Sequence, residues 1–406
     1  MASRMKWLSV VGIGESGLAG LSPIAQALID QATVFFGGSR HLAMLPADQR
    51  DRIAWKSPLS TSIDEILAHR GQAVCVLASG DPLCYGIGVT LTQRLPVTEM
   101  TILPAPSTFS LACARLGWSL TDIETLSLCG RPPALLHAVT YPGAKVLVLS
   151  EGRHTPAIVA DLLTQNGYGQ SLVTVLEHLG GQKERLISGR ANTWDATELA
   201  DLNAIALECI ADPGQIPVSR YPGLPDSAYH HDGQLTKREV RAVTLSTLAP
   251  TPGSLLWDVG AGCGSIAIEW MRSHPRCRAI AIEKSRTSYI ADNAIALGTP
   301  HLQIIQGTAP AALQDLPQPD AIFIGGGITT AGLMDTCWQA LKPGGRLVAN
   351  VVTLEGEHLL FQWAERIGGE FTRIGIQRAE PIGKFLGWRS LATVTQWTVI
   401  KPTIKP

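Results

Sequence analysis

The chain has 406 residues, which at about 150 residues per domain predicts two or three domains. Its 33 Lys and Arg residues nearly balance its 34 Asp and Glu residues, so neither a nucleic acid nor an anionic membrane surface is expected as a partner. Hydrophobic residues make up 45% of the chain and charged residues 17%, which excludes a mainly disordered protein.

The sequence carries no recognisable targeting or membrane-spanning segment. No apolar run reaches the roughly 18 residues that a transmembrane helix needs, and residues 1–11 lack the apolar region of a signal peptide. The eight cysteines form no C-x-x-C pair, and the histidines lack metal-ligand spacing. We therefore expect a cytoplasmic protein with reduced thiols and no metal bound by its side chains.

In the first half of the chain, short apolar runs alternate with helical patterns, as in α/β proteins. Ser22 followed by Pro23 predicts a helix start, because serine caps helices and proline suits the first helical position. The turn at 104–107, Gly117 and the loop at 130–133 predict two lobes that meet near residue 118. The predicted strands are residues 7–11, 33–36, 74–78, 100–103, 145–149, 172–176 and 204–209.

Residues 211–226 are rich in proline and glycine and show no apolar period, which predicts a linker. This linker separates a domain of residues 1–210 from a domain of residues 227–406. Both parts have the alternation of an α/β fold, and neither is a repeat of the other.

The second half alternates more regularly, in the pattern of a doubly wound sheet. Helices are predicted from Thr236, Ser265 and Ser285, and a further helix ends before Lys342. Two late strand-like runs end near Ile400, and their closeness predicts an antiparallel hairpin at one sheet edge. The other predicted strands are residues 255–259, 279–282, 302–305, 321–324 and 346–352.

The strongest chemical signal is a glycine loop directly after the strand 255–259. Glycines stand at 260, 262 and 264, so the backbone can pass close to a bulky ligand. The spacing differs from the G-x-G-x-x-G of dinucleotide-binding folds, so a phosphate is not indicated. Glu283 closes the next strand, where an acid can accept both hydroxyls of a ribose, and Thr308 and Ala309 follow the third strand at the same sheet edge. Together these features predict a nucleoside pocket.

This arrangement, with a later turn Lys342-Pro343-Gly344-Gly345, resembles the class I S-adenosylmethionine-dependent methyltransferases. The resemblance implies S-adenosylmethionine as cofactor and a mouth lined by Gly325-Gly326-Gly327 and Asn350. Glu283 stands where aspartate is commoner, and Thr308 where an acid often faces the adenine. The residues expected at the cofactor are Thr236, Gly260, Ala261, Gly262, Cys263, Gly264, Glu283, Thr308 and Ala309.

A basic cluster lies just before this glycine loop in the sequence. Thr236 and Glu239 have the spacing of a capping box, which predicts that Thr236 caps a helix. Lys237, Arg238 and Arg241 are either a solvated helix face or a group that holds substrate carboxylates. The candidates for substrate binding are Lys237, Arg241 and Asn350.

The segment Gly223-Leu224-Pro225-Asp226, followed by residues 235–241 and the glycine loop, is similar to the decarboxylating precorrin methyltransferases of corrin biosynthesis. The similarity covers essentially all of the second part of the chain. It implies methylation of a tetrapyrrole carbon together with loss of carbon dioxide from an acetate substituent, in cobalamin (vitamin B12) biosynthesis.

The first part resembles the class III, tetrapyrrole methyltransferase fold in three segments, residues 10–14, 78–82 and 104–108. The resemblance implies that S-adenosylmethionine lies in a cleft between two lobes and that the first glycine loop faces the macrocycle. Glu15-Ser16 depart from the Pro-Gly common at that loop, which leaves its contact with substrate open. The cofactor residues implied are Gly80, Asp81, Pro82 and Leu83, with Ser107 and Thr108 nearby.

Two alternatives to a pair of methyltransferases remain at this point. Gly12, Gly14 and Gly17 have dinucleotide-fold spacing, but the strand ending Phe36-Gly37-Gly38 carries no acid for a ribose, which disfavours NAD. The second alternative is that the first part is a non-catalytic binding module, fused to a methyltransferase that acts on another small molecule.

We therefore predict an α/β protein in which a two-lobed tetrapyrrole methylase domain precedes a doubly wound, Rossmann-like class I methyltransferase domain. The resemblance implies that the first methylates carbon 5 of a precorrin and that the second methylates carbon 15 and removes the ring C acetate carboxyl. A homo-oligomer is expected from the apolar composition and the family resemblance.

Overall fold

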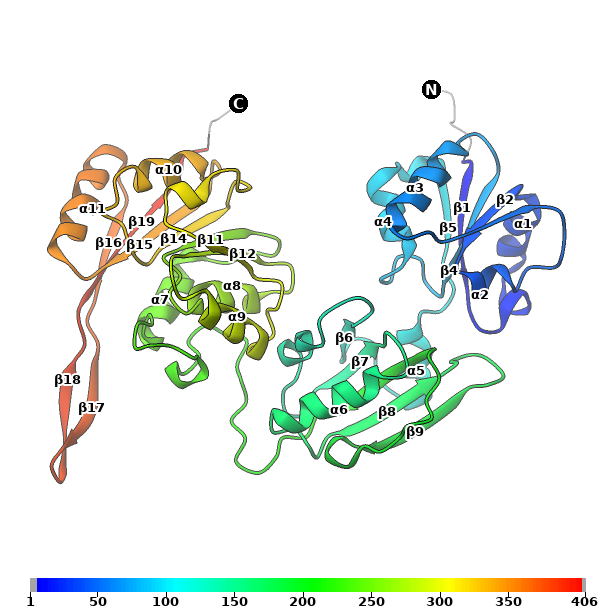
Figure 1. Ribbon diagram of the computed structural model, residues 1–406, viewed down its shortest axis with the longest axis horizontal. Helices are drawn as coiled ribbons and strands as arrows, with labels where there is room; N and C mark the ends of the chain where they lie inside the picture. Colours follow the sequence, from blue (N-terminus) through cyan, green and yellow to red (C-terminus); the bar gives the residue numbers. More distant parts are fainter. Residues whose placement is uncertain (1–5, 404–406) are drawn as a thin grey trace. The chain divides into compact units, whose positions relative to one another are not determined.

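The computed structural model describes residues 6–403, drawn in Figure 1. The chain divides into two compact units. The N-terminal unit contains the residues up to Pro133 and Val139–Gln215, and the C-terminal unit contains Ala134–Ala138 and the residues from Ile216 onward. Each unit has its own sheets and helices, so the mixed α/β class predicted from the sequence is confirmed.

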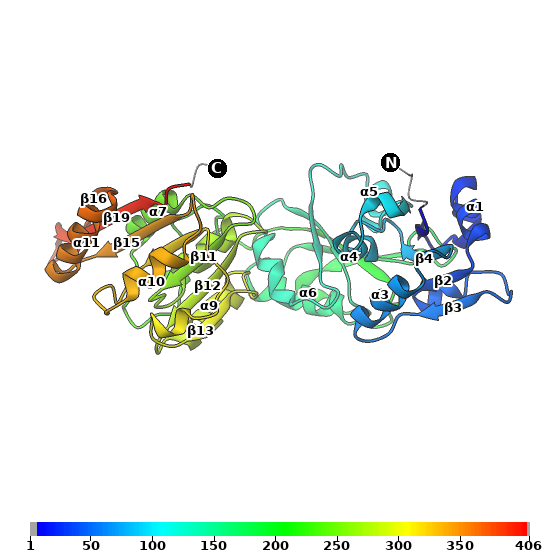
Figure 2. The same ribbon diagram turned by 90° about the horizontal axis from the view of Figure 1, so that it is seen from above.

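The first sheet of the N-terminal unit is entirely parallel, with strand order β3-β2-β4-β1-β5. Helices α1 and α2 pack on one face, and α3 and α4 on the other, because successive strand residues such as Val10 and Val11 face opposite sides. These elements, seen from above in Figure 2, are β1 (Leu8–Ile13), α1 (Pro23–Gln31), β2 (Val34–Gly37), α2 (Ser39–Leu42), β3 (Asp51–Ala54), α3 (Leu59–Ala68), β4 (Val74–Ser79), α4 (Ile87–Arg94) and β5 (Met100–Leu103).

The start of α1 follows the sequence prediction. Ser22 is the N-cap, and its Oγ accepts a hydrogen bond of 3.3 Å from the backbone N–H of Ala25. Pro23 occupies the first helical position, where a missing N–H costs nothing.

The second sheet of the N-terminal unit is mixed, with order β6-β7-β10-β8-β9, and β6 and β7 are its parallel pair. Helix α5 packs against it through Phe109 and Ala112, beside Leu147 and Leu176. The two sheets are separated in sequence between the end of α5 and the start of β6. The elements are α5 (Thr108–Leu116), β6 (Glu124–Ser127), β7 (Lys145–Leu149), α6 (Thr155–Gln165), β8 (Leu172–Glu177), β9 (Arg185–Arg190) and β10 (Asn203–Glu208).

The C-terminal unit is built on a seven-stranded sheet of order β13-β12-β11-β14-β15-β19-β16. The first five strands in that order are parallel, and helices α7, α8 and α9 cover one face while α10 and α11 cover the other. The elements are α7 (Arg238–Leu248), β11 (Leu255–Val259), α8 (Ser265–Ser273), β12 (Arg278–Glu283), α9 (Thr287–Ala296), β13 (Gln303–Gln306), β14 (Ala321–Ile324), α10 (Leu333–Ala340), β15 (Arg346–Val351), α11 (Leu354–Ile367), β16 (Glu370–Ile374) and β19 (Val394–Ile400).

The expected antiparallel pair at one edge of this sheet is β16 with β19. The sequence analysis missed the two strands between them, β17 (Gln377–Ile382) and β18 (Phe385–Ser390). These strands form a separate two-stranded hairpin. In Figure 1 this hairpin extends away from the sheet as a long arm.

The predicted linker is only partly a free connection. From Ile216 the chain groups with the C-terminal unit, and the backbone N–H groups of Gly223 and Leu224 donate to the carboxylate of Glu269, at 2.6 and 3.1 Å. The second half of the proline-rich stretch is therefore held by the C-terminal fold.

Candidate functional sites in the two units

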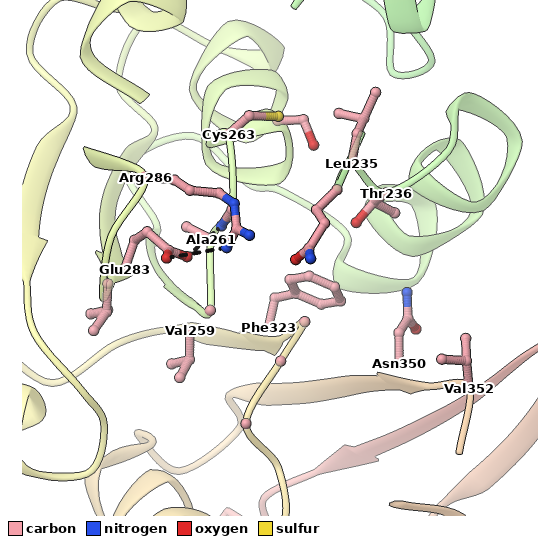
Figure 3. Close-up of a pocket in the computed structure, with 18 of the residues that line it drawn as sticks. Leu235, Thr236, Val259, Ala261, Cys263, Glu283, Arg286, Phe323, Asn350 and Val352 are labelled. Atoms are coloured by element: carbon pink, nitrogen blue, oxygen red, sulfur yellow. Dashed lines mark hydrogen bonds and ion pairs between the residues drawn. The ribbon is translucent and has the colours of Figure 1, made fainter. Parts of the chain in front are cut away.

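The C-terminal unit has a cavity of about 660 Å³ at the carboxyl ends of its parallel strands, where ligands of doubly wound sheets bind. Figure 3 shows how residues from β11, β12, β14 and β15 and from the segment before α7 surround it. Most of the residues predicted for the cofactor line it: Thr236, Gly260, Ala261, Gly262, Cys263, Glu283, Thr308 and Ala309. So do the predicted mouth residues Gly325, Gly326 and Gly327 and two of the substrate-binding candidates, Lys237 and Asn350.

The glycine loop forms the floor of this cavity with backbone rather than side chains. Gly260 has φ +72°, and a Cβ there would lie 2.9 Å from the backbone N of Gly326, so no larger residue fits. Gly262 also has a positive φ, of +59°, and a Cβ there would meet no atom closer than 3.5 Å. The wall at Gly262 is therefore free for the close approach of a ligand.

Glu283 stands at the end of β12 with its side chain turned toward the glycine loop (Figure 3). Its Oε2 accepts from the N–H of Gly262 at 2.9 Å, and its Oε1 accepts from the N–H of Ser285 at 3.1 Å. Each carboxylate oxygen keeps further acceptor capacity, as two ribose hydroxyls would require. The position fits the nucleoside chemistry predicted from the sequence.

Asp258, the acid that precedes the glycine loop, is buried and faces away from solvent. Its Oδ2 accepts from the N–H of Ala267 at 3.0 Å, which ties β11 to α8, and its Oδ1 makes no hydrogen bond with the described residues. Burial, opposed by the hydrogen bond from Ala267 and assisted by the negative charge of Glu283, raises the pKa of Asp258 to about 7. The fold therefore keeps Asp258 partly protonated at neutral pH.

Two predicted residues, Thr236 and Gly264, have other roles. Thr236 is not the N-cap of α7: that position is Lys237, and Asp226 Oδ1 accepts from the first helical N–H at 2.9 Å. Gly264 lies outside the cavity wall and serves packing, since a Cβ there would lie 2.8 Å from the side chain of Ile290.

Arg241 is fully buried, which corrects its prediction as a substrate-binding residue. Its Nε donates to Glu269 Oε1 at 2.6 Å, and its Nη atoms bond Asp226 and the carbonyl oxygens of Thr236 and Leu224. Glu269 also accepts from the hydroxyl of Tyr229 at 2.9 Å. The guanidinium of Arg241 bonds only groups inside the fold and holds the segment before α7 in place.

Lys237 and Asn350 remain at the cavity wall. Lys237 makes no ion pair with the described part of the chain, so its ammonium group is available to an anion. The Asn350 amide is already held, because its Nδ2 donates to Thr244 at 2.9 Å and its Oδ1 accepts from Gln396 at 2.9 Å. Lys237 is therefore the better placed of the two for carboxylate binding.

The N-terminal unit has a second cavity, of about 430 Å³, lined by residues of both lobes. Gly80, Asp81, Ser107 and Thr108 lie at its wall as predicted, whereas Pro82 and Leu83 do not. Asp81 Oδ1 accepts from the N–H of Leu83 at 2.8 Å and so shapes the turn, while the Leu83 side chain is half exposed.

A charged network crosses this second cavity. Glu15 pairs with Arg40 and accepts from Nδ1 of His178 at 2.9 Å, and Arg40 also contacts His41 Nε2 at 2.9 Å. Burial opposes ionisation of Glu15, yet the hydrogen bond from His178 and the charge of Arg40 lower its pKa below the usual value. Burial and the neighbouring Arg40 charge lower the pKa of His41 to about 4.

Sequence reading missed several residues of both cavities. In the N-terminal cavity these include Arg40, His41, Tyr85 and His178. In the C-terminal cavity they include the apolar residues Phe323, Val352, Ile376, Leu391 and Val394, together with Gln234 and Arg286. Phe323 lies in a strand that the sequence predicted, β14. The glycines that begin at Gly325, directly after this strand, indicated that its end borders a pocket.

Residues 6–403 contain no group of three or more His, Cys, Asp or Glu side chains arranged to hold a metal ion. They also contain no helix with the length and apolar character that crossing a membrane requires.

The two units match two protein families. Residues 8–194 match the family described as tetrapyrrole (corrin/porphyrin) methylases, and residues 227–401 match the family described as precorrin methyltransferase domain. The Salmonella typhimurium protein named cobalt-precorrin-7 C(5)-methyltransferase is 33% identical over 179 residues, which is 44% of this chain and 88% of that protein.

Longer relatives span both units. A Sinorhizobium sp. protein named precorrin-6Y C(5,15)-methyltransferase (decarboxylating) is 48% identical over 398 residues, covering 97% of this chain and 96% of that protein. The protein of the same name from Mycobacterium tuberculosis H37Rv is 42% identical over 398 residues, covering 97% of this chain and 99% of that protein. The chain therefore belongs to the family of the decarboxylating precorrin-6Y C(5,15)-methyltransferases.

Proposed function

We propose that the chain is an S-adenosylmethionine-dependent enzyme with two sites, which methylates a precorrin at carbons 5 and 15 and removes carbon dioxide from the ring C acetate. The observation that carries this proposal is the presence of a separate cavity in each unit of a chain that a relative matches over 97% of its length. The N-terminal unit is assigned carbon 5, and the C-terminal unit carbon 15 and the decarboxylation.

In the C-terminal cavity, Glu283 binds the ribose, and Thr308 and Ala309 lie where an adenine would stack beside β13. The bound cofactor supplies a methyl group already activated on a sulfonium. The protein then needs to align the methyl with the nucleophilic carbon and to exclude water. The apolar side chains of Phe323, Val352 and Ile376 serve the second purpose.

Carboxylate groups on the periphery of the tetrapyrrole can form ion pairs with basic side chains at the cavity mouth. Lys237 lies at the wall without an ion-pair partner among the described residues, which supports its role as an anchor for one of them. The acetate that loses its carboxyl group is held among less polar groups, since desolvation of a carboxylate favours release of carbon dioxide. The electron pair of the broken C–C bond passes into the conjugated ring, and a proton then completes the methyl group.

In the N-terminal cavity, the turn at Gly80 and Asp81 and the start of α5 at Ser107 and Thr108 hold the cofactor. Gly80 has φ +57°, and its carbonyl accepts from the N–H of Ala105 at 3.2 Å, which brings the two segments together. The charged network around Glu15 lines the same cavity, and we assign the tetrapyrrole to its side of the cavity.

Titration calorimetry with S-adenosylhomocysteine tests whether both units bind the cofactor. We expect two sites per chain in the wild type, loss of one in Gly262→Arg, and loss of the other in Asp81→Ala. Asp161→Ala, an exposed substitution on α6, is the matched control and keeps both sites. A single site that Gly262→Arg alone removes would reduce the N-terminal unit to a binding module.

We also propose that the chain forms a homo-oligomer through the hairpin of β17 and β18. Leu386 and Trp388, which lie on the same face of this hairpin, are 74% and 75% exposed, and an isolated two-stranded hairpin is only marginally stable in water. A second copy of the arm would bury these side chains.

Sedimentation equilibrium checks this assembly. Replacing Leu386 and Trp388 with Glu is expected to lower the molar mass to that of a single chain. Lys384→Glu, which changes charge at the exposed turn without removing apolar surface, is the control and keeps the mass. An unchanged mass in the Glu variant would contradict a hairpin-mediated assembly.

A further inference from the structure

The charged network of the N-terminal cavity joins the two lobes of that unit. Glu15 follows β1 in the first lobe, and His178 follows β8 in the second. The approach is close, because a Cβ at Gly181 would lie 2.7 Å from the Cβ of Glu15. Glu15 therefore reaches the histidine across the cavity and fixes its ring.

His178 is held in a backbone conformation that costs free energy. Its φ is +48°, in the left-handed region, and Tyr85 of the same cavity has φ +55°. Among the described residues, only two other non-glycine positions, Ala249 and Asp315, have positive φ. Strain of this kind gathers at functional sites, where the surrounding structure enforces it.

The hydrogen bond to Glu15 determines which ring nitrogen of His178 is basic. The pKa of Glu15 is lowered, so the carboxylate is ionised and accepts the Nδ1–H. The lone pair then resides on Nε2, which makes no hydrogen bond with the described residues, and the side chain is 26% exposed, at the cavity wall. The carboxylate behind the ring also fixes its orientation, with Nε2 on the side away from Glu15.

We propose that His178 is the proton acceptor of the methylation in the N-terminal unit and that Glu15 orients and supports it. The inference rests on the proposed function of this unit. A ring carbon uses the electron pair of its double bond to form the new C–C bond, while the C–S bond of the methyl donor breaks and its electrons go to sulfur. The proton on that carbon then passes to Nε2 of His178, and its C–H electron pair restores the double bond.

The substitution His178→Asn isolates the proton transfer. Asparagine tolerates a left-handed conformation, and its amide N–H still donates to Glu15, so fold and network are kept while the basic nitrogen is lost. In a single turnover of the full chain, we expect the carbon 5 methylation to slow by about 100-fold or more, as is usual on removal of a general base. Glu15→Gln is expected to slow it less, because the amide oxygen still accepts the Nδ1–H.

Two readouts separate catalysis from structure. The affinity of the N-terminal cavity for S-adenosylhomocysteine and the release of carbon dioxide by the C-terminal unit are expected to stay at wild-type values. With deuterium on the reacting carbon, a primary isotope effect on product formation is expected to appear in His178→Asn. His154→Asn, which changes an exposed histidine before α6, is the matched control and stays fully active.

Three results would overturn the assignment. Wild-type methylation at carbon 5 in His178→Asn would exclude a proton acceptor at this position, and so would loss of cofactor affinity in the same variant, which indicates a structural role. A wild-type chain that releases carbon dioxide but adds a single methyl group would instead refute the proposed function of the N-terminal unit, and the assignment with it.

Discussion

The two cavities use different parts of the chain to make their walls. In the C-terminal cavity the ligand-facing groups are mainly backbone, from Gly260 to Cys263, with the single acid Glu283 beside them. In the N-terminal cavity, charged side chains from separate elements, Glu15, Arg40 and His178, bond one another. A wall made of backbone leaves a short glycine motif in the sequence, whereas a wall made of distant side chains leaves none.

Two arginine–glutamate pairs sharpen the same contrast. Arg241 and Glu269 are 0% and 2% exposed in their side chains, and their bonds end inside the fold. Arg40 and Glu15 are 39% and 17% exposed and border a cavity. The same ion-pair chemistry therefore fixes architecture in one unit and stays within reach of a ligand in the other.

The largest expected effect comes from the buried pair. Glu269→Gln removes the charge opposite Arg241, and the free energy of unfolding of the C-terminal unit should fall by about 3–5 kcal/mol. Urea denaturation of the full chain measures it. Asp335→Asn, which breaks an exposed pair with Arg366 in the same unit, is the control and should leave the transition in place. Equal stability of Glu269→Gln and the wild type would refute the structural role of this pair.

The next largest effect is expected at Asp258, as a pH dependence of the free energy of unfolding. An unfolded aspartate releases its proton near pH 3.8, whereas the fold raises the pKa of Asp258 to about 7, so the wild type loses stability as the pH rises between these values. Asp258→Asn lacks this loss. Its stability relative to the wild type should rise by about 3 kcal/mol from pH 5 to pH 8. Parallel urea titrations at the two pH values check it, and a constant difference would contradict the raised pKa.

A smaller effect is expected on the affinity of the C-terminal cavity for the cofactor. Glu283→Ala removes both acceptors facing the predicted ribose and should weaken S-adenosylhomocysteine binding there about 10- to 100-fold. Calorimetry follows it while the N-terminal site provides an internal reference. Asp292→Ala, an exposed change on α9, is the control. Unchanged affinity in Glu283→Ala would move the ribose elsewhere in the cavity.

The smallest effect is expected at the cavity mouth. Lys237→Met should weaken precorrin binding by about fivefold at most, because partly exposed ion pairs contribute about 1 kcal/mol or less. Arg238→Met, at the neighbouring exposed position outside the cavity wall, should leave binding unchanged. Equal effects of the two substitutions, measured by fluorescence titration, would show a diffuse electrostatic contribution instead of a specific anchor.

Much of the fold was predictable because its central strands are continuous apolar runs. Strands β5, β7, β11 and β14 have the predicted bounds. The missed strands are edge strands or lie in the projecting hairpin, where polar residues face water and the apolar signal is weak. They are β3, β6, β9, β17 and β18. Such strands are set by their partners more than by their own composition.

The site was predictable to the extent that glycine loops and strand-end acids mark it. Arg241 was misread because its charge suggested a surface position, although it shares a helix face with the buried Leu245 and Leu248. His178 carried no local signal, since only the fold brings it to Glu15, 163 residues away in the chain. The unusual acid at position 15 was visible, and its partner was not.

The hydrogen bonds of Glu269 determine where the C-terminal fold begins. The Glu269 carboxylate accepts hydrogen bonds from Gly223, Leu224 and Tyr229. The second half of the proline-rich stretch is therefore part of the C-terminal fold and not a free linker. A protease cut or a gene split after Pro225 would take away the Gly223 and Leu224 N–H donors and leave a buried carboxylate short of donors. A split before Ile216 would spare them. The boundary at which the two units can be inherited or expressed separately therefore lies in the first part of this stretch, before Ile216, and not at its end.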